Sequence, residues 1–282
     1  MYVSQIDYTT PNASKDFCDS LVKTGFAVLK NHPIDYTLVK AVFQEWKDFF
    51  DSADKLKFTY NNDTQDGLFP INVSETAVGY TTKDLKEFFH YYQWGQCPDK
   101  LRKNSSLLFT QLNTLAKELL NWIEINTPTE IQSKLSQPLS QMIENSQQTL
   151  MRILHYPPLL GSETAGAVRA AAHEDINLIT VLVAASEPGL QVKDIDGVYH
   201  DVPVDPGMLA INIGDMLQEA TNGYYKSTTH QVVNPIDETA RHKARYSIPL
   251  FLHARPDVRL SKRYTAGEFL EQRLSELGIK KK

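Results

Sequence analysis

Hydrophobic residues recur with two different periods along this chain, and the change falls near residue 148. Before it, apolar positions repeat every three or four residues over 34–50, 108–123 and 131–143, the last stretch being interrupted by Pro138. This spacing places apolar side chains on one face of an α-helix, so we expect a mostly helical first half. The turn-forming residues 61–80 predict a loop.

After residue 148 the apolar segments become short and rich in β-branched residues, which is typical of strands. We expect strands over 150–156, 178–184, 189–192, 198–202, 208–213, 228–233 and 246–253. Many short strands with turns between them, such as 194–197, indicate a sandwich or a barrel.

Two sites carry the signature of a capping box, in which an acidic residue follows a capping residue by three positions. Asp84 and Glu87 predict a helix start or a short turn. Thr265 and Glu268 predict a final helix that runs to about residue 277.

Length and composition narrow the class of protein. The chain has 282 residues, of which 41% are hydrophobic, so it can bury one large core. Its net charge of −5 argues against a nucleic-acid partner, because such proteins usually present a basic surface. We find no signal peptide and no stretch near the roughly 20 apolar residues of a membrane span, so we expect no membrane partner. Cys18 and Cys97 are far apart, and we expect both to be reduced thiols in a cytoplasmic protein.

Three residues late in the chain suggest a metal site. His173 and Asp175 are two positions apart, and His230 follows 55 residues after Asp175. Residues two apart on a strand point to the same face, so we expect His173 and Asp175 to face one way. Two imidazoles and one carboxylate form the facial triad that binds non-haem Fe(II) and leaves coordination positions open. A His-x-Asp pair alone is common by chance, so the residues that flank it must indicate whether it belongs to a metal site.

Those flanks carry a family pattern. Asn-Ile-Gly-Asp stands at 212–215, Asn-Gly-Tyr-Tyr-Lys-Ser-Thr-Thr-His at 222–230 and Arg-Tyr-Ser at 245–247. In this order, the motifs make the stretch from about 150 to 257 closely resemble the 2-oxoglutarate- and Fe(II)-dependent oxygenases of the isopenicillin N synthase-like superfamily. More weakly, residues 24–32 resemble that family's opening strand.

The resemblance implies a mainly β fold with flanking helices around a double-stranded β-helix, or jelly-roll, core. We expect one domain, 1–282, in which a mostly helical region, 1–148, packs on a catalytic core, 149–257, and a helix and tail follow at 258–282.

The resemblance also implies a cofactor and two co-substrates. Fe(II) would bind the His-Asp-His triad, and 2-oxoglutarate and O2 would react there. Arg245 and Ser247 alternate on a predicted strand, and a guanidinium pairs with a carboxylate in a fixed bidentate geometry. The family pattern assigns Arg245 and Ser247 to the distal carboxylate of 2-oxoglutarate, with Tyr156 beside it. The family frequently has Asn two residues before that tyrosine, where this chain has Leu154.

Other polar residues have local interpretations. Gly214 is expected to permit a tight turn, and Asn212 and Asp215 are interpreted as structural. Arg152 and Arg169 flank the tyrosine and metal segment, and either one could anchor an anionic substrate or form a structural salt bridge.

The implied function is oxidation of a small-molecule substrate by hydroxylation, desaturation or ring closure, with release of succinate and CO2. One alternative is an Fe(II)/O2 oxidase of the same superfamily that does not use 2-oxoglutarate. Another is a catalytically silent 2-oxoglutarate-binding sensor, for which a broken triad would be typical. A zinc hydrolase fits the flanking motifs least well. The substrate and the oligomeric state stay open.

Overall fold

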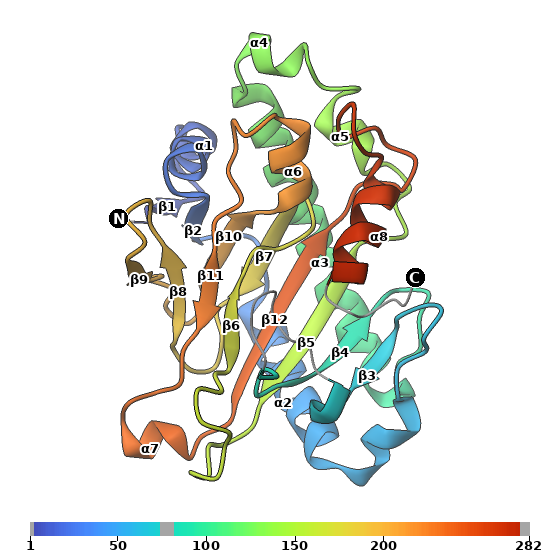
Figure 1. Ribbon diagram of the computed structural model, residues 1–282, viewed down its shortest axis with the longest axis vertical. Helices are drawn as coiled ribbons and strands as arrows, with labels where there is room; N and C mark the ends of the chain where they lie inside the picture. Colours follow the sequence, from blue (N-terminus) through green and yellow to red (C-terminus); the bar gives the residue numbers. More distant parts are fainter. Residues whose placement is uncertain (1–2, 74–81, 277–282) are drawn as a thin grey trace.

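The computed structural model describes residues 3–73 and 82–276, and within them two β-sheets face each other with helices outside the larger one (Figure 1). The larger sheet has eight strands in the order β1-β2-β10-β7-β12-β5-β4-β3. They are β1 (Gln5–Asp7), β2 (Phe26–Lys30), β3 (Gly67–Phe69), β4 (Glu87–Tyr91), β5 (Leu150–Tyr156), β7 (Ile179–Val183), β10 (Leu209–Ile213) and β12 (Arg245–Leu252).

The smaller sheet has the order β6-β11-β8-β9. Its strands are β6 (Ala170–His173), β8 (Leu190–Lys193), β9 (Tyr199–Asp201) and β11 (His230–Val232). β11 pairs antiparallel with β6, and His230 lies directly opposite His173. This register brings two histidines that are far apart in the sequence onto neighbouring strands.

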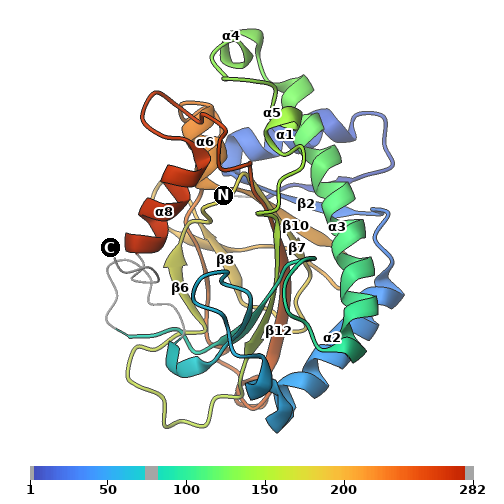
Figure 2. The same cartoon turned by 90° about the vertical axis from the view of Figure 1, so that its right-hand side faces the viewer.

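Helices cover the outer face of the larger sheet. Figure 2 shows α2 and α3 along one side of that sheet, with β6 and β8 on the other side and α8 near them. The α-helices are α1 (Ala13–Thr24), α2 (Tyr36–Asp51), α3 (Asp99–Asn126), α4 (Thr129–Gln132), α5 (Leu139–Met142), α6 (Asp215–Ala220), α7 (Glu238–Arg241) and α8 (Ala266–Glu276). Two 3-10 turns, Ala53–Phe58 and Ile71–Val73, complete the described helical segments. No helix in residues 3–73 and 82–276 is both long and apolar enough to cross a membrane.

Side chains along the central strands alternate between two faces of the larger sheet. One face packs in the hydrophobic core against the helices, and the other faces the space between the two sheets. In β12, Tyr246, Ile248, Leu250 and Leu252 belong to the hydrophobic core that packs against the helices. The residues between them, from Arg245 to Phe251, face the other way and line a cavity. Successive strand side chains point to opposite faces, so one strand serves both the core and the site.

Most predicted elements of the second half are confirmed. β5 coincides with the predicted strand 150–156, and the other six predicted strands each overlap an observed strand. The final helix also begins as predicted. The backbone NH of Thr265 donates to Glu268 Oε2 at 2.7 Å, and the backbone NH of Glu268 donates to Thr265 Oγ1 at 3.2 Å, which completes the capping box. Residue 277 lies outside the described residues.

The first half contains more strand than its hydrophobic spacing predicts. The loop prediction for 61–80 is wrong at β3, and its residues 74–80 lie outside the described part. Of the two expectations for Asp84, the helix start is wrong, because β4 begins at Glu87. A short turn is present, in which the backbone NH of Lys86 donates to the carbonyl oxygen of Asp84 at 2.9 Å. Asp84 accepts from the backbone NH of Ala171 at 2.9 Å, so its carboxylate serves a tertiary contact.

Two helical expectations also need correction. The stretch 131–143 is not one helix: α4 and α5 are separate four-residue helices, and Pro138 immediately precedes α5. α1 was not predicted, although Ala13, Phe17 and Leu21 repeat every four residues and are all buried.

Candidate metal and co-substrate site

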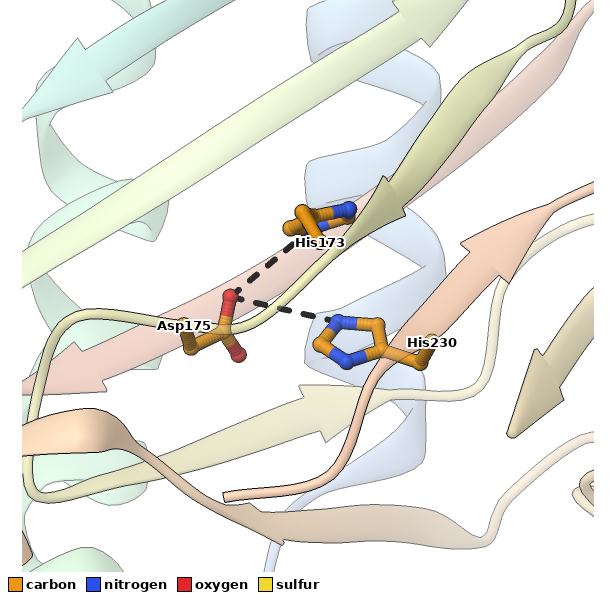
Figure 3. A group of neighbouring side chains, drawn as sticks. All are labelled: His173, Asp175 and His230. Carbon is orange, nitrogen blue, oxygen red and sulfur yellow. Dashed lines mark ion pairs between the residues drawn. The ribbon is translucent and has the colours of Figure 1, made fainter. Parts of the chain in front are cut away.

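Three ligating atoms converge at one end of the smaller sheet (Figure 3). Nε2 of His173 lies 4.0 Å from Asp175 Oδ1, and Nε2 of His230 lies 3.9 Å from the same oxygen. All three ligand atoms are within 4.8 Å of one another. β6 ends at His173, so Asp175 lies in the following loop and not on the strand as expected. The loop after β6 brings the carboxylate of Asp175 back towards His173 and towards His230, the first residue of β11.

Hydrogen bonds leave the inward nitrogen of each histidine available. Nδ1 of His173 is 2.7 Å from the carbonyl oxygen of Ala171, and Nδ1 of His230 is 3.1 Å from that of Thr228. A carbonyl only accepts, so each Nδ1 carries the proton and each Nε2 presents a lone pair. Burial lowers the pKa of His173 to about 4, which keeps the imidazole neutral at pH 7. Neutral imidazole is the form that ligates a metal ion.

The carboxylate of Asp175 is held through one oxygen only. Oδ2 accepts from Thr180 Oγ1 at 2.6 Å and from Asn212 Nδ2 at 2.8 Å. Oδ1 is the oxygen that faces the two histidines. Asn212, interpreted from the sequence as structural, therefore orients the candidate ligand directly. Thr180 was missed, because the sequence does not reveal that β7 and β10 place it beside Asn212.

Two glycines allow the segments that carry these residues to approach closely. Gly25 ends α1 with φ of 72°, and a Cβ there would overlap Oγ1 of Thr228, the residue whose carbonyl orients His230. Gly214 has φ of −103°, so the expected need for a tight turn is wrong. A Cβ on Gly214 would instead overlap the carbonyl oxygen of Asn177, in the loop after Asp175.

A cavity of about 570 Å³ extends from the triad between the two sheets. Every second residue of β5 and β12 faces it. On β5 these are Leu150, Arg152, Leu154 and Tyr156, and on β12 Arg245, Ser247, Pro249 and Phe251, with His253 just beyond. Leu270 and Leu274 of α8 also line this space. The triad and the predicted co-substrate residues thus share one cavity, as a metal-bound co-substrate requires.

Arg245 has the chemistry of a carboxylate receptor. It is 2% exposed, its Nε donates to the carbonyl oxygen of Glu187 at 2.9 Å, and its guanidinium carbon lies 5.1 Å from the ring centroid of Tyr156. Nη1 is buried without a hydrogen-bond partner in the described chain. An unpaired buried guanidinium nitrogen is costly, so a ligand anion fits this position. Ser247 lies two residues along on the same face and is 3% exposed.

The other predicted polar residues separate into different roles. Arg152 lines the cavity, and its Nε donates to His90 Nε2 at 2.9 Å. Arg169 is not among the cavity-lining residues, and one of its terminal nitrogens donates to the carbonyl oxygen of Lys243 at 3.0 Å. Asp215 was expected to cap or pair locally, but it pairs with Arg273 of α8 at 3.3 Å, which is a structural contact between segments distant in the sequence.

Residues that the sequence did not single out also line the cavity. Lys86 is buried and pairs with Asp84 at 2.8 Å. His253 is 8% exposed at the end of β12. Its alternation with Arg245 and Ser247 along 245–253 was a signal that could have placed it in the site.

Comparison with known proteins agrees with this geometry. Residues 147–254 match the 2OG-Fe(II) oxygenase superfamily, and residues 4–109 match the family described as non-haem dioxygenase in morphine synthesis N-terminal. A candidate oxygenase from Shewanella oneidensis is 54% identical, with a TM-score of 0.89 over 99% of this chain and all of that one. The 2-oxoglutarate-dependent dioxygenase frbJ of Dothideomycetidae sp. (strain 11243) is 27% identical over 86% of this chain and 70% of its own.

The fold comparison extends to a structure with a bound co-substrate. A full-length Neurospora crassa protein in complex with alpha-KG has a TM-score of 0.79 and 23% identity, over 96% of this chain and 95% of that one. The predicted jelly-roll fold class is thereby confirmed. Fe(II), 2-oxoglutarate and O2 are the cofactor and co-substrates of this enzyme class, and the chain belongs to the 2OG-Fe(II) oxygenase superfamily.

Proposed function

We propose that this dioxygenase binds Fe(II) through His173, Asp175 and His230 and oxidises a small-molecule substrate while 2-oxoglutarate is converted to succinate and CO2. The observation that carries the proposal is the presence of two complementary features in one cavity. One is the convergence of two Nε2 lone pairs and one carboxylate oxygen. The other is the buried guanidinium of Arg245, whose Nη1 has no partner among the described residues.

The chain's own residues would perform the binding and orienting steps. The chemistry that Fe(II) supplies when bound is activation of O2 for oxidation of a substrate C–H bond. Arg245 and Ser247 would hold the distal carboxylate of 2-oxoglutarate by charge-assisted hydrogen bonds, with Tyr156 packed against the guanidinium. Burial of Arg245 strengthens this pairing, because water does not compete for the carboxylate.

The walls of the cavity would exclude water while the reaction proceeds. Phe88, Leu154 and Phe251 line it from the larger sheet, and Leu270 and Leu274 line it from α8. A cavity of about 570 Å³ suits 2-oxoglutarate together with a small substrate. The substrate could then be hydroxylated, desaturated or cyclised, depending on which of its C–H bonds is held nearest the metal.

The test is succinate formation by the purified protein with Fe(II), 2-oxoglutarate and O2. Slow succinate release without added substrate, and its acceleration by a compound from a metabolite library, are the expected results. Asp175→Ala and His230→Ala should abolish it and lose stoichiometric metal binding while keeping the native circular dichroism. His242→Ala is the control, because this exposed histidine lies at the end of α7, and it should match the native protein.

Two results would contradict the proposal. Full succinate release by Asp175→Ala or His230→Ala would show that the triad does not hold the metal. Substrate oxidation without stoichiometric succinate would instead identify an oxidase that does not use 2-oxoglutarate.

A further inference from the structure

One polar atom at the end of the cavity opposite Arg245 has no role in the chemistry described above. β12 directs Arg245, Ser247, Pro249 and Phe251 inward, and the same alternation continues to His253 just past its end. His253 is 8% exposed and lines the cavity. It is not part of the group of candidate metal ligands formed by the triad.

A hydrogen bond to the backbone fixes which of the two ring nitrogens of His253 carries the proton. Nδ1 lies 3.1 Å from the carbonyl oxygen of Phe251, so Nδ1 carries the proton. Nε2 therefore presents a lone pair, and no donor in residues 3–73 or 82–276 forms a hydrogen bond with it. Burial lowers the pKa of His253 to about 4, so the imidazole is neutral at pH 7. Nε2 is not among the fully buried side-chain atoms that lack a partner, so it is accessible from the cavity that His253 lines, and a ligand there can supply the donor.

The charges nearby restrict what that donor can be. The guanidinium carbon of Arg152 lies 5.3 Å from the ring centroid of Phe251 and 4.3 Å from that of Phe88. Its Nε donates to His90, which in turn is 2.8 Å from the carbonyl oxygen of Gln65, so the cation is held in place. Two charges act on His253: Asp175 raises its pKa and Arg152 lowers it. When a metal ion compensates the charge of Asp175, Arg152 is left as the acting cation and repels a second one, which disfavours an ammonium group as the donor.

The walls restrict the shape of the ligand. Phe88 and Phe251 line the cavity with Phe69, whose ring stacks on that of Phe88 at 4.8 Å. Leu270 and Leu274 add an apolar wall from α8. Aromatic and aliphatic walls of this kind favour a flat, apolar ring or skeleton with few polar groups.

We propose that His253 is a substrate-recognition residue whose Nε2 accepts a hydrogen bond from an uncharged O–H or N–H group of the substrate. The substrate class is a small ring compound that carries a hydroxyl, amide or imide donor, and amines are disfavoured at this position. This inference rests on the proposed function, because it assigns the substrate end of the same cavity.

The test uses three probes that share one ring and differ at one group. Benzyl alcohol carries a neutral donor, benzyl methyl ether carries none, and benzylamine is an ammonium ion at pH 7. Their binding is measured by saturation-transfer NMR on full-length protein loaded with Zn(II), which is redox-silent, and 2-oxoglutarate. We expect benzyl alcohol to bind about tenfold more tightly than the ether, as for one buried hydrogen bond, and benzylamine to bind most weakly.

Variants connect the preference to the imidazole. His253→Leu should remove the preference for the alcohol over the ether. His253→Gln should keep part of it, because the side-chain carbonyl of glutamine is also an acceptor. His242→Leu is the matched control and should behave as the native protein, since His242 is an exposed residue of the α7 end. Binding of 2-oxoglutarate by each variant shows that it is folded.

Each outcome decides the inference. Equal binding of the alcohol and the ether, no binding of the alcohol, tighter binding of benzylamine, or an unchanged preference in His253→Leu would overturn it. Succinate release by the native protein is measured separately. Succinate release without a preference for the alcohol would retain the proposed function and reject this inference. A preference for the alcohol without any succinate release would retain the role of His253 in binding and reject the proposed function.

Discussion

Replacing Asn212 by alanine removes one of the two hydrogen bonds that orient the candidate metal ligand Asp175. Nδ2 of Asn212 donates to Oδ2 at 2.8 Å, and Thr180 Oγ1 donates to the same oxygen at 2.6 Å. Asp175 is 8% exposed, so water does not readily replace a lost donor. In Asn212→Ala the carboxylate keeps Thr180 but can rotate away from the two histidines.

The expected loss follows from the charge on the acceptor. A hydrogen bond to a charged group contributes about 1.5–3 kcal/mol, which corresponds to roughly 10- to 150-fold in an equilibrium constant. Residues that orient metal ligands typically affect metal affinity by about 10- to 100-fold. We therefore expect Asn212→Ala to weaken Fe(II) binding by about 10- to 100-fold. Thr180→Val should have a similar effect, and the double variant a larger one.

The assay is an anaerobic Fe(II) titration competed by a chelator, followed by succinate release at saturating Fe(II). Most of the activity should return at high Fe(II), because all three ligands are still present. Asn104→Ala is the matched control: Asn104 also donates to a carboxylate, Glu45 Oε1 at 2.6 Å, but between α3 and α2. That variant should bind Fe(II) like the native protein.

The reasoning fails if Asn212→Ala and Thr180→Val both bind Fe(II) within about twofold of the native value. Such a result would mean that the loop after β6 fixes Asp175 without help from these donors. A loss as large in Asn104→Ala would mean that the titration reports general destabilisation.

Three further predictions concern Arg245 at one end of the cavity, His253 at the other end, and Arg273 of α8. Arg245→Leu should raise the half-saturating 2-oxoglutarate concentration by roughly 30-fold or more, since losing a buried charge pair costs about 2–5 kcal/mol, while Ser247→Ala should raise it about fivefold. Succinate formation against 2-oxoglutarate concentration checks both, and a change below threefold in Arg245→Leu would refute the assignment. The folded-state pKa of His253, about 4, lies below the ordinary 6.5, so the unfolded chain binds more protons between these values and stability falls as pH drops from 6.5 to 4. The native free energy of unfolding should decline over that window by up to roughly 3 kcal/mol more than that of His253→Gln, and parallel declines in denaturant melts would contradict this. Arg273→Met leaves Asp215 buried without its ion-pair partner, so it should lower the free energy of unfolding by about 1–3 kcal/mol, and an unchanged denaturation midpoint would refute it.

The second half of the chain could be predicted well because its signals are local. β5 reads directly from 150–156, and the capping box at Thr265 depends on residues three apart. The first half was harder, because its strands are defined by partners distant in sequence. β4 is paired with β5, and Glu87 at its start bonds His155 at 2.8 Å, a contact that no local pattern contains.

The site shows the same division. The identities of His173, Asp175 and His230 follow from spacing and flanking motifs, but their geometry does not. Asp175 reaches the histidines from a loop, and Thr180 orients it from β7. These contacts depend on the order of strands in two sheets, which cannot be read from local patterns in the sequence.

The alternation of side chains along β12 also sets the distance between the residues at the two ends of the cavity. Arg245 and His253 lie eight residues apart on the same face, which corresponds to roughly 27 Å of extended backbone. The intervening core residues, Ile248 and Leu250 among them, are fully buried against the helices and anchor the strand. On the assignments proposed above, substitutions at Phe251 and His253 would change which molecules the cavity accepts without disturbing Arg245 at the other end of the strand. A single strand would thus carry both the proposed co-substrate contact and the proposed substrate contact, and each could change without the other.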